Sequence, residues 1–97
     1  MNVVHMSDIR IARIFSYENK DKMFFTIGAC DRTHVDAIWD KNDKPAIRVR
    51  IYDNSASLSL EKEVHLGDYV VFNAKETKVL DILTPEQFHY SYITLEE

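Results

Sequence analysis

The sequence Ala46-Ile47-Arg48-Val49-Arg50-Ile51-Tyr52-Asp53-Asn54 holds the clearest structural pattern in the chain. Its odd positions from 47 to 51 are isoleucine and valine, and its even positions from 48 to 52 are two arginines and a tyrosine. Because a β-strand has a side-chain period of two, we predict a strand with one apolar face and one face of cations and an aromatic ring. The apolar face needs a core. The other face has charge for phosphates and a ring that stacks on bases, which favours the central strand of a small barrel that binds single-stranded nucleic acid.

Length and composition restrict the class of protein. The 97 residues are expected to form a single domain, 1–97, and 45% hydrophobic with 29% charged residues is ordinary for a folded chain. No apolar run approaches the roughly 20 residues of a membrane span, and Met1–His5 lacks the pattern of a secretory signal. A lone Cys30 fits a reducing compartment. Cysteine and histidine show no metal-ligand spacing, so no metal and no cofactor is expected.

The charge is unevenly distributed along the chain. The net charge of −4 argues at first against nucleic acid, because basic patches usually drive that binding. Residues 9–50, however, hold nine basic against six acidic residues, whereas residues 51–97 hold three lysines against nine acidic residues. The cations therefore gather around the opening strand, and we expect affinity to depend on stacking and hydrogen bonds, with a shallow salt dependence.

Local patterns predict five strands. They are expected over 9–17 with a bulge or bend near Ala12, 23–30, 46–52, 69–79 and 88–95. The polar residues 18–22 are typical of a hairpin connection, and residues 34–45 of a long loop with at most one helical turn. Between the third and fourth strands, Ser57 is a candidate cap for a short helix or turn that ends near Gly67. The fold class is therefore predicted as all-β, a five-stranded OB-fold barrel, with an SH3-like barrel as the competing architecture.

A resemblance to a known family rests on three motifs. Arg50-Ile51-Tyr52-Asp53-Asn54 is followed a dozen residues later by His65-Leu66-Gly67-Asp68-Tyr69, and then by Thr77-Lys78. Together with Phe25–Thr33, these motifs resemble the second OB domain of the protection-of-telomeres (Pot) family of telomere end-binding proteins, over roughly residues 8–80. Two departures are Cys30, where the family has tryptophan, and Arg32, where it has glycine. A short chain of this kind is most similar to a single-OB member such as nematodes carry, or to one domain of a larger protein.

The resemblance implies sequence-specific, non-catalytic binding of the single-stranded G-rich telomeric overhang in the nucleus, at the chromosome end. It places the tyrosine and aspartate that match Tyr52 and Asp53 at the DNA-binding surface. Tyr52 is then a base-stacking residue, although it could also simply cover the outer face of a barrel. Asp53 is either a turn-forming residue or the acceptor for the two donors on the Watson–Crick edge of guanine.

Other candidates lie on the same predicted groove. Arg48 and Arg50 are predicted to meet phosphates or stack on bases, or else to be solvated charges. Phe24 and Thr26 share the outer face of the expected second strand, and Trp39 is either a base platform or a lid over the core. The strand ends add Arg32, His34, Lys75 and Thr77. Tyr90 and Tyr92 are more typical of core or oligomer contacts.

No pattern in the sequence indicates an enzyme. Cys30 has no arrangement of histidine and carboxylate around it, and no glycine-rich phosphate loop or carboxylate cluster is present. The leading hypothesis is thus a telomeric single-stranded DNA-binding OB domain, with telomere proteins as possible partners and no membrane association. Two alternatives stay open: a protein-interaction OB subunit of a replication-protein-A-like or telomere-capping complex, which the acidic C-terminal half favours, and an RNA-binding OB module.

Overall fold

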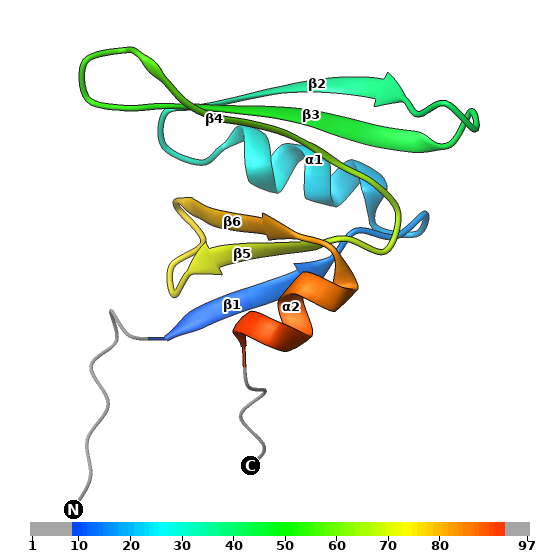
Figure 1. The fold of residues 1–97 in the computed structure, drawn as a ribbon. Coiled ribbons are helices and arrows are strands. Elements are labelled where there is room, and N and C mark those ends of the chain that lie inside the picture. The colour runs from blue at the N-terminus through cyan, green and yellow to red at the C-terminus, as the bar shows by residue number, and fades with distance from the viewer. Residues whose placement is uncertain (1–8, 93–97) are drawn as a thin grey trace, which may run out of the picture.

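The computed structural model describes residues 9–92 as two small sheets with two short helices (Figure 1). Residues 1–8 and 93–97 lie outside the described residues, and with them the N-terminal pentapeptide and the end of the expected fifth strand. In chain order the elements are β1 (Arg10–Ile14), α1 (Lys20–Gly28), β2 (Thr33–Trp39), β3 (Pro45–Tyr52), β4 (Leu58–Val64), β5 (Tyr69–Asn73), β6 (Val79–Leu83) and α2 (Pro85–Ser91).

The two sheets are antiparallel, and α1 lies between them. One has the strand order β2-β3-β4 and the other β1-β5-β6 (Figure 1). The main core contains Met23 and Ile27 of α1, Val49 of β3 and Phe72 of β5, all at most 2% exposed. Helix α2 forms a second, smaller cluster, in which Phe88 stacks on Tyr69 with ring centroids 4.0 Å apart. Both sheets therefore depend on α1 for the burial of their inner faces.

The predicted central strand is confirmed. β3 spans Pro45–Tyr52 and pairs on both sides, with β2 and with β4. Its inward residues Ile47 and Val49 are 2% and 0% exposed, as the alternation requires. The mostly β class is confirmed as well. The strands form two open sheets, however, in place of the closed five-stranded barrel that the sequence led us to expect.

The predicted second strand is wrong, because residues 20–28 form helix α1. Met23 and Ile27 are one turn apart and both enter the core, followed by the buried Cys30. Of the polar residues 18–22 assigned to a hairpin, residues 20–22 begin this helix and residues 18 and 19 lie in the turn before it. The first strand is shorter than expected, Arg10–Ile14, and pairs with β5 without a bulge at Ala12.

The region assigned to a long loop is mostly strand. β2 occupies Thr33–Trp39 and joins β3 through a turn in which Asp40 Oδ1 accepts hydrogen bonds from the amides of Asn42 and Lys44. Of the short helix or turn expected between Ser57 and Gly67, the helix is absent from the described residues, because β4 (Leu58–Val64) occupies this segment. The predicted break at Gly67 is confirmed as a turn, since this glycine has φ +94°.

The C-terminal part differs from the prediction in two ways. The expected fourth strand ends at Asn73, where a turn leads into β6. Residues 88–91 of the expected fifth strand belong to helix α2. This helix begins with a cap in which Thr84 accepts a hydrogen bond from the Gln87 amide and the Gln87 side chain accepts one from the Thr84 amide. Pro85 follows at the first helical position, where it favours a helix start. No helix in the described residues has the length and apolar character needed to cross a membrane.

Candidate functional site

The two predicted arginines of β3, Arg48 and Arg50, lie on the outer face of the β2–β3–β4 sheet, and each has a carboxylate partner there. Arg50 Nε donates to Glu61 Oε2 at 2.8 Å, and its Nη1 lies 3.9 Å from Asp36 Oδ2. Arg48 Nη2 lies 3.6 Å from Glu63 Oε2. The register explains this pattern, because Arg48 lies directly opposite Glu63 and Arg50 directly opposite Glu61 on β4, while Asp36 of β2 lies diagonal to Arg50.

This pairing changes the electrostatics of the predicted phosphate-binding row. The hydrogen bond to Glu61 raises the pKa of Arg50 above its usual range. His34, another predicted residue, lies 3.5 Å from Asp36 on the same face. A phosphate that approaches this face therefore meets arginines already neutralised by their neighbours and must compete with carboxylates.

The Tyr52-Asp53 end of β3 is built as a turn. The Tyr52 amide donates to the carbonyl of Arg32 at 2.9 Å, which places these two predicted residues side by side. Asp53 Oδ1 accepts hydrogen bonds from the amides of Ser55 and Ser57 and from the Ser55 hydroxyl. The hydrogen bond from the Ser55 hydroxyl contributes most, and together these bonds lower the pKa of Asp53. The structure thus gives Asp53 a turn-forming role.

The remaining predicted polar residues belong to other parts of the fold. Thr26 lies in α1 and donates to the carbonyl of Lys22, within its own helix. Lys75 and Thr77 lie in the turn between β5 and β6, where the Thr77 hydroxyl accepts from Asn73 Nδ2. The Thr77 carbonyl accepts from the Asp31 amide, so this turn lies beside the connection before β2. These residues do not form one row with Arg48 and Arg50.

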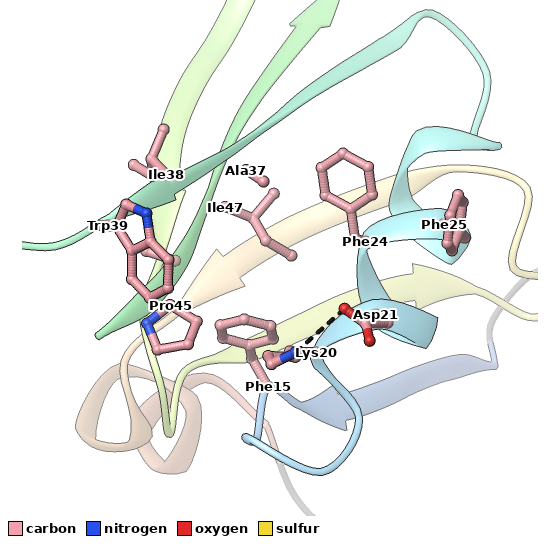
Figure 2. A pocket seen from close by; sticks show the side chains of 11 residues that line it. Phe15, Lys20, Asp21, Phe24, Phe25, Ala37, Ile38, Trp39, Pro45 and Ile47 are labelled. Carbon is pink, nitrogen blue, oxygen red and sulfur yellow. Dashed lines mark hydrogen bonds and ion pairs between the residues drawn. The ribbon is translucent and has the colours of Figure 1, made fainter. Parts of the chain in front are cut away.

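Two predicted aromatic residues, Phe24 and Trp39, come together at a cleft. It lies between α1 and the end of the β2–β3 hairpin, and has a volume of about 370 Å³. Figure 2 shows Trp39 and Pro45 on one side of it and the two phenylalanines of α1 on the other. The lining residues are Phe15, Lys20, Asp21, Phe24, Phe25, Ala37, Ile38, Trp39, Pro45, Ala46 and Ile47.

Two of the aromatic rings that line the cleft, those of Phe25 and Trp39, are largely exposed. Phe25 is 73% exposed and Trp39 is 72% exposed, whereas Phe15 within the cleft is only 1% exposed. Lys20 lies beside Phe15, and its ammonium pairs with Asp21 at 3.3 Å (Figure 2). The cleft is therefore mainly apolar and aromatic, with a small charged group at one side.

Phe25 is the main residue that the sequence prediction missed. Strand periodicity places Phe25 on the face opposite to Phe24, with Ile27 and Ala29. In a helix, neighbouring side chains diverge by about 100°, so Met23 and Ile27 take the core face and Phe25 turns to solvent. A helical spacing of residues 23, 27 and 30 was the signal that would have identified the exposed ring.

The one cysteine of the chain, Cys30, is buried just after the end of α1. Cys30 Sγ donates to the carbonyl of Thr26, and burial raises the pKa of this thiol. Among residues 9–92, no three histidine, cysteine or acidic side chains gather as a metal site requires. In comparisons with known proteins, no protein-family model matches the chain, no curated protein matches it and no solved structure matches it.

Proposed function

We propose that this chain is a non-enzymatic protein-interaction module that binds an apolar segment of a partner in the cleft between α1 and the β2–β3 hairpin. The observation that carries this proposal is the exposure of two large rings, Phe25 and Trp39, that both line one apolar cleft. Exposed apolar groups scattered singly need no explanation, but a clustered aromatic patch is typical of an interaction surface.

The walls of the cleft are held by the core. On one side, Met23 and Ile27 fix α1 with side chains at most 2% exposed. On the other side, Trp39 and Pro45 lie opposite each other in the paired strands β2 and β3. A ligand therefore meets surfaces that are already ordered, so little conformational entropy is lost on binding.

Charge favours a protein partner over a nucleic acid. The chain has a net charge of −4, and the cleft has one lysine beside one aspartate. Phosphate binding gains most of its affinity from clustered cations and the release of counterions. An apolar peptide needs no such cluster, because burial of its side chains supplies the binding free energy.

A selection from a displayed library of random dodecapeptides tests this proposal. We expect peptides rich in apolar residues that bind the wild-type chain and lose binding to Phe25→Ala. Trp39 is the single tryptophan, so its fluorescence emission should shift to shorter wavelength on titration with a selected peptide. Tyr90→Ala is the matched control, because Tyr90 is 88% exposed on α2, away from the cleft. Failure to enrich any peptide that depends on Phe25 would overturn the proposal.

Single-stranded nucleic acid is the second candidate ligand, with the G-rich telomeric strand as its most specific form. One observation favours it: Arg48, Arg50 and Tyr52 lie along one face of β3 and are all partly exposed. The two open sheets count against an OB barrel, and the carboxylates opposite the arginines count against phosphate binding.

Oligonucleotide titration separates the two candidates. Telomeric G-strand, C-strand, scrambled DNA and the RNA version of the G-strand would each be added to the chain at low and at high salt. Submicromolar binding to the G-strand alone, lost in Tyr52→Ala and kept in Phe25→Ala, would support nucleic acid at the outer face. Tighter binding to the RNA would point to an RNA-binding module.

A further inference from the structure

β2 is an outer strand of its sheet, so one side of its backbone has no neighbouring strand. Two hydrogen bonds establish which residues face β3. The Tyr52 amide donates to the Arg32 carbonyl, and the Asp40 amide donates to the Lys44 carbonyl. Because paired residues alternate in an antiparallel ladder, the even-numbered residues of β2 direct their backbone groups to β3.

The odd-numbered residues direct theirs away from the sheet. Within residues 9–92, no hydrogen bond reaches the backbone N–H or C=O groups of Val35, Ala37 or Trp39 from outside the β2–β3 ladder. The side chains of Ala37 and Trp39 are also part of the cleft lining. The unpaired backbone edge and the apolar cleft therefore lie side by side.

The opposite edge of this sheet is formed by β4, which is protected against the addition of a further strand. β4 carries Glu61, Lys62 and Glu63 in succession, and such charges block the addition of a further strand. The ammonium of Lys62 also donates to the carbonyl of Ile82 in β6 at 3.1 Å, so β4 is tied to the other sheet at this point. In β2, the residues with outward backbone groups have apolar side chains from Val35 onward and include no lysine.

We propose that the partner segment binds as an added strand along β2, an inference that rests on the proposed function of the cleft. The main chain of the segment would pair with the outward groups of Val35, Ala37 and Trp39. Every second side chain would then enter the cleft between β2 and α1. This mode requires an extended segment with apolar residues two positions apart.

Charge indicates which residues the partner segment carries between its apolar positions. Asp36 lies on the outer face of β2, is 42% exposed in its side chain and makes only long ion-pair contacts, at 3.5 Å to His34 Nε2 and 3.9 Å to Arg50 Nη1. A residue of an added strand directly opposite has its Cβ atom roughly 5 Å away, where opposite charge is favourable. The net charge of −4 also attracts a basic segment. The partner is therefore an extended protein segment in which apolar residues alternate with lysine or arginine.

The same random dodecapeptide library tests this mode, because the spacing of the selected residues is the readout. We expect apolar residues at every second position with basic residues between them. Selected peptides should slow amide hydrogen exchange at Val35, Ala37 and Trp39. Apolar residues spaced by three and four, with exchange unchanged, would overturn strand addition while leaving the cleft as a binding site. Absence of any Phe25-dependent peptide would overturn both proposals.

Two changes isolate the backbone contribution. A selected peptide with N-methyl groups on the residues that face β2 keeps its side chains but loses its ladder donors. In the protein, Ala37→Pro removes one outward N–H without touching the β2–β3 ladder, with Ala37→Ser as the matched control that keeps it. We expect each blocking change to weaken binding by roughly tenfold or more, in line with an unsatisfied backbone hydrogen bond. Unchanged affinity of the N-methylated peptide would overturn the inference whether or not the proline variant folds.

Discussion

Replacement of Trp39 by alanine should weaken peptide binding strongly and lower the stability of the fold only slightly. Trp39 is 72% exposed, so only about a quarter of its surface contacts the protein. For a side chain of about 250 Å², that quarter is roughly 70 Å², or less than about 2 kcal/mol of stability at ~25 cal/mol/Å². The exposed remainder is available to a ligand. Typical losses of ~2–4 kcal/mol at a central aromatic contact then correspond to a roughly 30- to 1,000-fold weaker complex.

Thermal unfolding and calorimetric titration with a selected peptide measure the two effects on one sample. The melting temperature of Trp39→Ala should fall by less than about 15 °C, at roughly 4–8 °C per kcal/mol for a domain of this size. Phe25→Ala should behave in the same way, and Tyr90→Ala should leave both quantities unchanged. A Trp39→Ala variant that is unfolded at room temperature would show that this ring is a lid over the core. A loss of affinity below threefold in a folded variant would refute the role of the ring in binding.

Three further predictions concern the fold. The hydrogen bonds that lower the pKa of Asp53 stabilise the turn fully above the ordinary carboxyl pKa, and this contribution is lost as the pH falls through the lowered folded value. An NMR titration of the Asp53 carboxyl carbon should show that lowered midpoint, and an ordinary one would contradict the turn geometry. Glu76→Gln removes the negative charge and one of the two acceptors from the pair with Arg13, whose bonds are 2.7 and 2.8 Å long, and should cost about 0.5–1 kcal/mol in denaturant unfolding. That difference should shrink in 1 M salt; a constant difference would exclude an ionic origin. Ile27→Ala, at a fully buried position, should cost ~2–5 kcal/mol, and a cost below about 1 kcal/mol would contradict its place in the core.

The strand β3 could be predicted because its pattern depends on local rules alone. Ile47 and Val49 alternate with polar residues, and β-branched residues favour extended backbone. The prediction for the α1 segment was wrong for the opposite reason. Its sequence Phe24-Phe25-Thr26-Ile27 favours a strand by propensity, while its helical spacing becomes decisive only once two sheets are present to bury Met23 and Ile27.

The C-terminal helix shows a local signal that was outweighed. Thr84, Pro85 and Gln87 form a capping box with proline at the first helical position, and each of these residues is visible in the sequence. The alternating aromatics of residues 88–92 suggested a strand more strongly. The cleft itself could not be predicted, because it exists only where β2 returns along α1 and brings Trp39 toward Lys20 and Phe24.

The two faces of the β2–β3–β4 sheet differ in what a ligand must displace. On the outer face, a phosphate can bind Arg50 only if it displaces Glu61. This exchange of one anion for another yields little net free energy. At the cleft, a ligand displaces only water from Phe25 and Trp39, and each 100 Å² of apolar surface that it covers contributes about 2.5 kcal/mol. The outward N–H groups of Ala37 and Trp39 exchange bonds to water for bonds to an added strand, which fixes direction and register more than it adds affinity. Specificity is therefore expected from the β2 edge and affinity from the two rings.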